Sequence, residues 1–427
     1  MHKGVCILGC FFLFLLLSSC NSWRKITYNF SEYKGYKKFD KIDLPGAETP
    51  FAFHLGSKEM QTQIASLNVQ PNGFNNPNAP NYSLEEYLRE ETKTTAFLII
   101  QNDSILYEQY FDHFDQDAPL PSFSVAKSFV SALVGIAIQE GKIQSVHDPV
   151  TAYLPELLDA APEWKDLHIQ HLLNMRSGIR FDEDSYSNPF GDIINFYISR
   201  DHFEWVRKAQ FAHPPGTFHY YSSLDTEILG FILERATGKK LAHYLHEKLW
   251  LPLGMESDGF WSIDSKKHQA PKAYCCLNAS ARDYAKLGRL YLNHGNWNGV
   301  QILDSSWVHE SITPNRINGC YQNQWYSGNR YTKSVKKEGN YEIMRFPDSL
   351  LAAEQPLLPT QFIQRDATDS DQWVIRNCGP DFFALGVFGQ EVYVMPERNM
   401  IFVRLGKKSD PYTNFLFRKV AWALKNS

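Results

Sequence analysis

Ser124 and Lys127 are the residues whose types and spacing first suggest chemistry. They form a Ser-x-x-Lys motif near the start of the apolar stretch PSFSVAKSFVSALVGIAIQEG (121–141), whose apolar residues recur at helical spacing. Side chains three positions apart lie on one face of a helix, so the Lys127 amine is expected over the Ser124 hydroxyl. A serine becomes an effective nucleophile when a neighbouring base removes its proton. The pair therefore predicts covalent catalysis by an activated serine.

The Ser-x-x-Lys motif is weak by itself, because it also begins at Ser22, Ser31 and Ser334. The first two lie in a polar, basic N-terminal segment, and the third lies in a lysine-rich run. Only Ser124 opens a long apolar helix, whose N-terminus also carries partial positive charge. The alternative interpretation is an ordinary helix start with a solvated lysine, so the choice depends on other motifs.

Two further motifs lie downstream of this helix. Tyr221-Ser222-Ser223 follows a Pro-Pro-Gly turn and precedes an expected helix, and Ala384-Leu385-Gly386-Val387 lies in alternating apolar sequence. Tyrosine and lysine both have ordinary pKa values of about 10, so neither is a base near neutral pH without help from its surroundings. Two arrangements fit: a Tyr221 phenolate beside charged Lys127, or a Tyr221 that shuttles a proton between Lys127 and the leaving group.

These three motifs, in this order, resemble the serine β-lactamase-like family. That family includes class C β-lactamases, DD-peptidases, family VIII esterases and 6-aminohexanoate-dimer hydrolase. The segments HDPVTAYLPEL, HLLNMRSGI, PGTFHYYSS and GQEVYVMPERNMIFVRLG add to the resemblance, which covers roughly residues 90–427. The resemblance implies that Ser124, Lys127 and Tyr221 are catalytic. It also implies an oxyanion hole made by the backbone N–H groups of Ser124 and Val387, and substrate contacts from Tyr186, Ser223 and Gly386.

One strand departs from the family pattern. Many β-lactamases and DD-peptidases carry Lys-Thr-Gly or His-x-Gly where this chain has Ala384-Leu385-Gly386. The cation in that motif helps to seat a substrate carboxylate, so its absence favours the amidase and esterase branch. The PGTFHYYSS and GVFGQ segments are most similar to the 6-aminohexanoate-dimer-hydrolase-like members.

We therefore expect a serine hydrolase that cleaves a small-molecule or peptide-like amide or ester through an acyl-enzyme on Ser124. The alternative enzyme is a peptidoglycan DD-peptidase or a β-lactamase. The alternative of another class is a catalytically silent lipoprotein that binds muropeptides.

The expected elements predict an α/β (α+β) fold of the β-lactamase/transpeptidase type, in which an antiparallel sheet is flanked by helices. A hairpin is expected at 94–112 around Asn102-Asp103, with a second at 381–405, because each pairs two apolar runs across a turn. Helices are expected after Ser83, within 278–292 and at 412–424. The hydrolase domain is expected at 86–427. It would contain a mostly helical subdomain at about 140–300 and a family-atypical insertion at about 333–371.

The N-terminus has the pattern of an export signal. Lys3 is followed by the apolar run Val5–Leu17 and then by Leu-Ser-Ser-Cys, which ends at Cys20. This tetrapeptide resembles the bacterial lipobox, which implies a signal peptide at 1–19 and lipid on Cys20. Residues 20–85 would be a tether and accessory region. Asn21 favours the outer membrane, so we expect a lipid-anchored protein in the bacterial cell envelope that faces the periplasm.

Composition and missing motifs exclude other classes. A net charge of −4 and a pI near 6.4 give no reason to expect a nucleic-acid partner. The chain has no Gly-x-Ser-x-Gly, His-Glu-x-x-His or Cys-x-x-Cys, so neither a metal nor another cofactor is expected. Adjacent Cys275 and Cys276 are expected to be buried thiols rather than a bridge. The acidic run Asp182-Glu183-Asp184 is expected to be a solvated loop rather than a cation site.

Overall fold

The computed structural model describes most of the chain. It covers residues 35–70, 80–184, 190–315, 319–328, 378–410 and 413–424, with Tyr186, Asn188 and the backbone of five short strands between 335 and 377. The expected signal peptide, Cys20 and most of the expected insertion at 333–371 lie outside the described residues. Among the residues that are described, no helix combines the length and apolar character that a membrane crossing needs.

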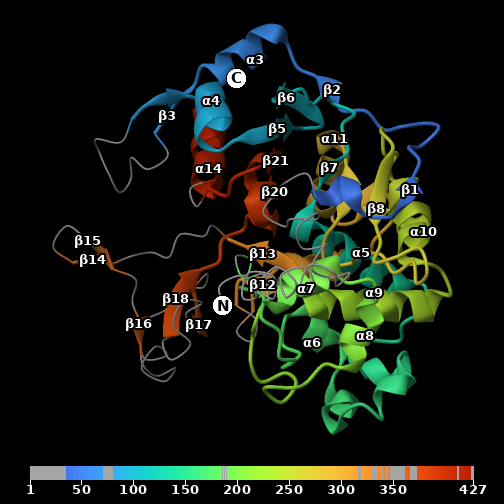
Figure 1. The fold of residues 1–427 in the computed structure, drawn as a ribbon. Coiled ribbons are helices and arrows are strands. Elements are labelled where there is room, and N and C mark those ends of the chain that lie inside the picture. The colour runs from blue at the N-terminus through green and yellow to red at the C-terminus, as the bar shows by residue number, and fades with distance from the viewer. Residues whose placement is uncertain are drawn as a thin grey trace, which may run out of the picture.

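An eight-stranded sheet forms the centre of the fold, with the strand order β12-β13-β19-β20-β21-β5-β6-β2. Its strands are β2 (His54–Leu55), β5 (Thr94–Gln101), β6 (Ser104–Tyr110), β12 (Tyr321–Gln322), β13 (Trp325–Ser327), β19 (Phe382–Gly386), β20 (Gln390–Met395) and β21 (Met400–Gly406). Every pair is antiparallel except β2 with β6. Strands from both ends of the sequence therefore lie side by side (Figure 1), which confirms the predicted fold class.

The sequence predicts the turns of the central sheet only in part. Asn102 and Asp103 both have positive φ, as a two-residue hairpin turn requires, and β5 and β6 form the predicted hairpin. The segment 381–405 was predicted as one hairpin, but it forms three strands. An additional reversal lies between β19 and β20, where Phe388 has φ 61° and Gly389 has φ 78°.

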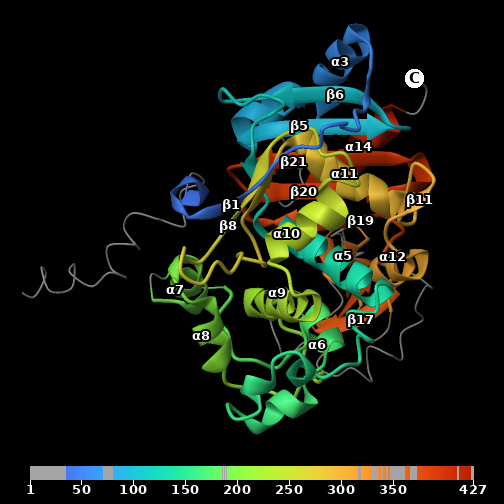
Figure 2. The same cartoon turned by 90° about the vertical axis from the view of Figure 1, so that its right-hand side faces the viewer.

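Alternate residues of the central strands face two separate cores. In β5, Leu98 and Ile100 belong to the larger core, whereas Phe97 and Ile99 belong to the smaller one. The larger core contains residues of α5 (Ala126–Gln139), α9 (Ser223–Thr237) and α11 (Ala281–Leu292). The smaller core contains residues of α3 (Lys58–Ala65), α4 (Leu84–Glu86) and α14 (Thr413–Ala423). The sheet thus lies between two helical layers (Figure 2), and both of its faces are buried.

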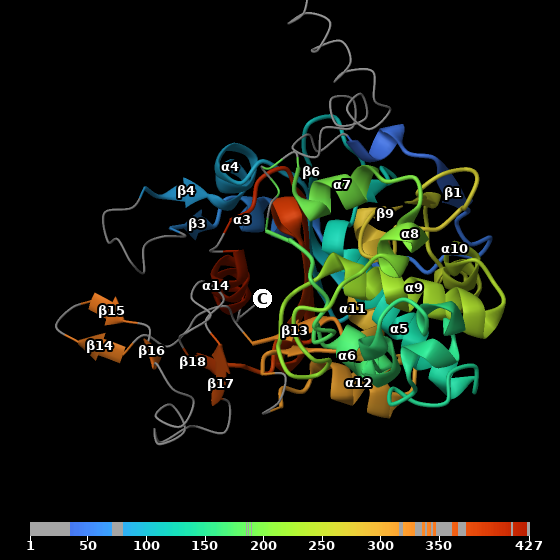
Figure 3. The ribbon, with the colours of Figure 1, turned by 60° about the horizontal axis from the view of Figure 1, so that its bottom comes forward.

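Helices dominate from Val150 to Trp250, on one side of the sheet (Figure 3). They include α6 (Ile169–Leu173), α7 (Asp192–Ile198), α8 (His202–Arg207), α9 and α10 (Leu241–Leu245). The chain then forms β8 (Gly259–Ser262), β9 (Leu277–Ala279), α11 and α12 (Ser305–Ile312). Helix α11 packs on the main sheet: a Cβ on its Gly288 would lie 3.1 Å from side chains of Val392 and Ile401.

A smaller, four-stranded sheet joins distant parts of the chain in the order β1-β8-β9-β7. Strand β1 (Lys41–Leu44) pairs with β8, so part of the expected accessory region contributes directly to this sheet. Strand β7 (Leu120–Pro121) pairs with β9, which brings the segment before Ser124 against the segment after Cys276. This pairing is what positions the nucleophile candidate.

The structure contains two disulfides among its described residues. Cys320 and Cys378 are joined across the two ends of the 329–377 segment. Cys275 and Cys276 are buried as predicted, but they are joined to each other, so the prediction that they are thiols rather than a bridge was wrong. Cys276 has φ 69°, and this left-handed turn brings the two adjacent side chains together. Two small sheets lie between Cys320 and Cys378 in the sequence. In one, β14 (Val335–Lys337) pairs with β15 (Asn340–Glu342); the other has the strand order β16 (Arg345–Phe346), β18 (Trp373–Asn377) and β17 (Gln361–Arg365).

Candidate active site

Ser124 lies in a single 3-10 turn, Phe123–Val125, directly before α5. The sequence predicts Phe123 as part of the helix, but its φ of 42° is left-handed and the α-helix begins only at Ala126. Such a conformation costs roughly 1–2 kcal/mol for a residue with a side chain. The Ser122 N–H holds the turn by donating to the Leu277 carbonyl of β9 at 2.9 Å.

Lys127 lies one helical turn after Ser124, and the expected contact is present. Its Nζ is 3.0 Å from Ser124 Oγ, 3.2 Å from Ser223 Oγ and 2.9 Å from the Tyr274 carbonyl oxygen. The side chain is only 1% exposed. Burial lowers the pKa of the Lys127 amine to about 8, while nearby carboxylates oppose this shift; those carboxylates belong to Glu183, Glu227 and Asp225.

Tyr221 lies beside Lys127 and belongs to the loop that precedes α9. The Lys127 Nζ lies 5.0 Å from the centre of the Tyr221 ring. Burial raises the pKa of Tyr221 well above its usual value, and the neighbouring Tyr326 and Tyr321 act in the same direction. The nearby Ser124 hydroxyl lowers the pKa of Tyr221 by a smaller amount. The Tyr221 side chain is therefore a neutral phenol near neutral pH.

The end of strand β19 meets the Ser124 turn at Gly386. A Cβ at this position would lie 2.6 Å from the Ser122 carbonyl oxygen and 3.0 Å from the Ser124 nitrogen. Only glycine permits so close an approach. The Ser124 N–H is among those that a helical turn leaves without an internal partner, and Val387 is the first residue beyond the strand. Two backbone amides thus come from elements that meet beside the nucleophile.

The departure from the family pattern on β19 has a structural counterpart. Ala384 is buried in the larger core, and Leu385 is partly buried against the smaller one. Neither residue supplies a cation to the site. The absence of a cationic residue in this part of the sequence therefore corresponds to apolar packing on both faces of the strand.

Glu183 is the site residue that the sequence interpretation missed. Asp182 and Asp184 are exposed, as expected, but Glu183 is only 3% exposed, so the prediction of a solvated acidic loop was wrong for this residue. Its Oε2 accepts the Ser223 backbone N–H at 2.8 Å, and its Oε1 accepts the Ser223 hydroxyl at 2.7 Å. A signal was available in the sequence, because Glu183 lies two residues after the buried Phe181 and shares its side of an extended segment.

Tyr186 and Ser223 complete the site cluster, which also contains Ser124, Lys127, Glu183 and Tyr221. The Tyr186 hydroxyl donates to Glu183 Oε1 at 2.9 Å, and Ser223 Oγ lies between Lys127 and Glu183. The structure thus brings together six of the expected site residues, with Val387 next to the last of them in sequence: Ser124, Lys127, Tyr186, Tyr221, Ser223 and Gly386. Cys20 is outside the described residues.

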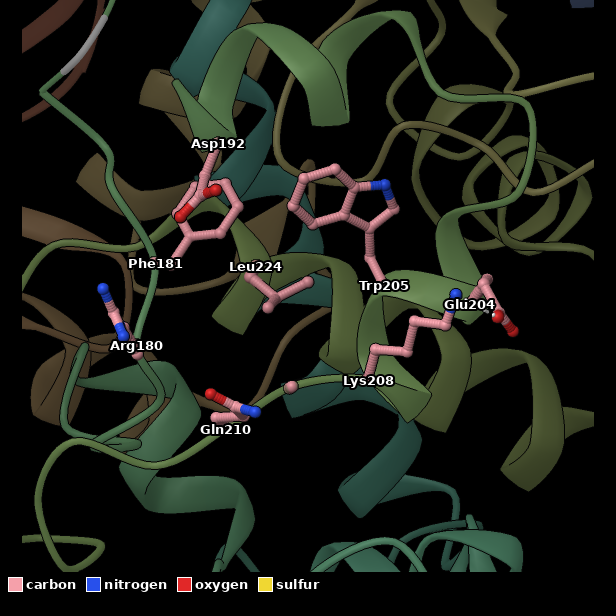
Figure 4. Close-up of a pocket in the computed structure, with 9 residues that line it drawn as sticks. Arg180, Phe181, Asp192, Glu204, Trp205, Lys208, Gln210 and Leu224 are labelled. Carbon is pink, nitrogen blue, oxygen red and sulfur yellow. Dashed lines mark ion pairs between the residues drawn. The ribbon is translucent and has the colours of Figure 1, made fainter. Parts of the chain in front are cut away.

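Among the described residues, no group of His, Cys, Asp and Glu has the arrangement of a metal site. In a surface hollow of about 490 Å³, Phe181 and Trp205 lie on either side of Leu224 (Figure 4). Its lining contains none of Ser124, Lys127 and Tyr221.

Comparisons with known proteins identify the family of the chain. Residues 83–426 match the model of the family described as Beta-lactamase. The chain is 26% identical over 341 residues to 6-aminohexanoate-dimer hydrolase of Paenarthrobacter ureafaciens, a match that covers 77% of this chain and 76% of that enzyme. Esterase EstB of Burkholderia gladioli is 27% identical over 207 residues, which cover 44% of this chain and 52% of the esterase.

Solved structures give the same fold. A Bacillus anthracis protein provisionally named as a 6-aminohexanoate-dimer hydrolase has a TM-score of 0.70 and 22% identity, with 94% of both chains covered. EstCE1, a hydrolase with promiscuous acyltransferase activity, has a TM-score of 0.54 and 15% identity, with 79% of this chain and 96% of that chain covered. Because the family model spans most of the sequence, the chain belongs to the beta-lactamase family and is a serine hydrolase of that family.

Proposed function

We propose that the protein hydrolyses a small amide or ester through a covalent acyl-enzyme on Ser124. The observation that carries the proposal is the 3.0 Å contact between Ser124 Oγ and a buried Lys127 whose pKa is about 8. At pH 7 about one in ten such lysines is neutral and able to accept a proton. A serine beside an available base has the arrangement that nucleophilic catalysis requires.

In the first half of the reaction, neutral Lys127 takes the Ser124 hydroxyl proton while Oγ attacks the substrate carbonyl carbon. The backbone N–H groups of Ser124 and Val387 donate to the developing oxyanion. Tyr221, a neutral phenol, donates its proton to the leaving amine or alcohol and recovers one from Lys127. This assignment favours the shuttle role of Tyr221 over a phenolate base, because the pKa of Tyr221 is raised and that of Lys127 is lowered.

In the second half, a water molecule attacks the acyl carbon and gives up its proton through the same groups. The bond between Ser124 Oγ and the acyl carbon breaks, and Oγ regains a proton. The products are a carboxylic acid and a free enzyme in its starting protonation state.

The substrate class follows from the apolar end of β19. Because Ala384 and Leu385 provide no cation, we propose that a carboxylate beside the scissile bond is not required for binding. Two of the relatives reported above, one named for an amide dimer and one for an ester, have chemistry consistent with this proposal.

A panel of p-nitrophenyl esters, simple amides and D-amino-acid peptides tests the reaction and ranks substrates. Wild type is expected to turn over at least one ester or amide, and Ser124→Ala to reduce kcat to background while it unfolds at the same temperature. Ser122→Ala serves as the matched control, because its buried hydroxyl donates to the Phe123 carbonyl rather than facing Lys127. An unchanged rate in Ser124→Ala contradicts the proposal.

A further relative, from Escherichia coli, is provisionally named a D-alanyl-D-alanine carboxypeptidase. The second reaction to test is therefore that of a peptidoglycan DD-peptidase or a β-lactamase. Mass spectrometry after exposure to fluorescent penicillin, together with nitrocefin hydrolysis, separates it from the first. We expect neither a stable adduct nor rapid nitrocefin turnover. Stoichiometric acylation of Ser124 by penicillin, without ester turnover, favours the peptidase instead.

We also propose that the protein is anchored in the bacterial envelope by lipid on Cys20, because the sequence before it matches a lipobox. Expression of the full chain with radiolabelled palmitate, followed by membrane fractionation, tests this. The label and the membrane association should both disappear in Cys20→Ser. Retention of both in that variant contradicts the proposal.

A further inference from the structure

Glu183 is a buried carboxylate that the reaction described above does not use. It accepts hydrogen bonds from the Ser223 N–H, the Ser223 hydroxyl and the Tyr186 hydroxyl. Burial of a carboxylate is costly unless it is well bonded, so its placement beside the catalytic lysine needs a reason. The reason lies in the direction of the hydrogen bonds that link Glu183 to Lys127 through the Ser223 hydroxyl.

Ser223 fixes that direction. Burial raises the pKa of Glu183, whereas the charge of Lys127 and the hydrogen bonds from Ser223 and Tyr186 lower it and favour the carboxylate. A serine hydroxyl has one hydrogen, and an ionised carboxylate can only accept. The Ser223 hydrogen therefore goes to Glu183 Oε1, at 2.7 Å, and Ser223 Oγ is left to accept from Lys127 Nζ, at 3.2 Å. The Tyr274 carbonyl, 2.9 Å from the same Nζ, is also an acceptor only.

A neutral lysine amine has two hydrogens and one lone pair. Ser223 Oγ and the Tyr274 carbonyl take the two hydrogens, and the third neighbour of Nζ is Ser124 Oγ, at 3.0 Å. The lone pair then points at the nucleophile's proton. If Glu183 could not accept, the Ser223 hydroxyl would be free to donate to Nζ and would occupy the lone pair that catalysis needs.

We propose that Glu183 is a positioning residue that acts through Ser223 to direct the lone pair of neutral Lys127 toward Ser124. The inference rests on the proposed function, because it assigns Lys127 as the base. Glu183 touches neither the nucleophile nor the substrate carbonyl in this role. It sets which way one hydroxyl points.

The charge of Glu183 provides a second test of this role, because it affects the pKa of Lys127 as well as the direction of the hydrogen bonds. Its carboxylate raises the pKa of Lys127 against the larger effect of burial. The other titratable groups that interact with Lys127 or Glu183 are Asp225, Glu227, Tyr186, Tyr220, Tyr221, Tyr274 and Tyr321. Removal of the Glu183 charge leaves those groups in place, so the pKa of Lys127 should fall further and the acid limb of the rate profile should move to lower pH.

The experiment measures kcat and KM from about pH 6 to pH 10 for wild type, Glu183→Gln and Asp184→Asn, with a p-nitrophenyl ester as the probe. In Glu183→Gln we expect kcat to fall about 10- to 100-fold with KM nearly constant, and the acid limb to shift to lower pH. A glutamine keeps one acceptor oxygen for the fixed Ser223 N–H and turns an NH2 toward the Ser223 hydroxyl, so that hydroxyl loses its acceptor. Glu183→Asp should recover part of kcat because it restores a carboxylate with two acceptor oxygens. Asp184→Asn changes the exposed neighbouring carboxylate and should leave both kcat and the limb unchanged.

Ser223→Ala keeps the inference testable if Glu183→Gln unfolds. That variant removes the linking hydroxyl and should lose kcat to a similar degree. The double variant should lose little more than either single variant, because both break one chain of hydrogen bonds. A kcat for Glu183→Gln within twofold of wild type, an unmoved acid limb, or fully additive losses overturns the inference. Absence of any Ser124-dependent turnover in wild type would instead overturn the proposed function.

Discussion

Gly386→Ala offers a strict test of how β19 meets the nucleophile turn. The added Cβ would lie 2.6 Å from the Ser122 carbonyl oxygen, 3.0 Å from the Ser124 nitrogen and 3.1 Å from Phe123 Cβ. The first two contacts are with backbone, so the strand end or the turn must move by roughly half an ångström or more. Either movement displaces a proposed oxyanion donor.

The size of the effect follows from the geometry that such donors require. An oxyanion donor must lie about 2.7–3.1 Å from the oxyanion, and the loss of one typically costs about 2.7–4 kcal/mol of barrier. We therefore expect Gly386→Ala to lower kcat about 100-fold or more, with a smaller change in KM. Overpacking should also cost about 1–3 kcal/mol of stability.

The assay compares kcat and KM on a p-nitrophenyl ester with the thermal unfolding of each variant. Gly379→Ala is the matched control, because its Cβ would meet nothing closer than Gly328 Cα at 3.7 Å. That control should retain wild-type kcat. A folded Gly386→Ala variant with kcat within twofold of wild type would refute the placement of the oxyanion hole at this junction.

Three other outcomes follow from the structure. The kcat/KM of wild type should rise with pH through about 8, as the Lys127 amine loses its proton, and a profile that is flat from about pH 6 to 9 would contradict this. Burial lowers the pKa of Lys127 from 10.5 to about 8, so between these pH values the unfolded state binds more protons than the folded state and wild type loses stability as pH falls. Lys127→Met lacks this titration and should therefore gain stability relative to wild type as pH falls from 10.5 to 8. Denaturation at each pH measures the difference. Cys320→Ser should lose up to about 4 kcal/mol of unfolding free energy in urea titrations, because its disulfide closes a loop with a sequence separation of 58 residues, and an unchanged midpoint would argue against the bridge.

Local sequence patterns predicted most elements that position the site. The Asn102-Asp103 turn, the capping box formed by Ser83 and Glu86, and the Ser124–Lys127 spacing each depend on residues within four positions of one another. Patterns of this range fix backbone conformation, so they can be read along the chain. The order of the three motifs then indicated which segments meet.

The features that were missed depend on distant contacts or on unusual backbone conformation. Glu183 accepts hydrogen bonds from Ser223, which lies 40 residues away, and no local pattern specifies that pairing. The extra reversal between β19 and β20 needs a left-handed backbone at Phe388, and a phenylalanine in the sequence does not predict that conformation. The bridge between Cys275 and Cys276 likewise depends on the left-handed backbone at the second cysteine.

The central claim is that Ser124 becomes acylated during turnover. Intact-mass measurement after rapid acid quenching of wild type with an activated ester tests it directly, with peptide mapping to locate the added group. We predict one acyl group on the peptide that contains Ser124, formed at the rate of turnover and absent in Ser124→Ala. Turnover by wild type with no acyl group on Ser124, or the same rate in Ser124→Ala, would contradict the account.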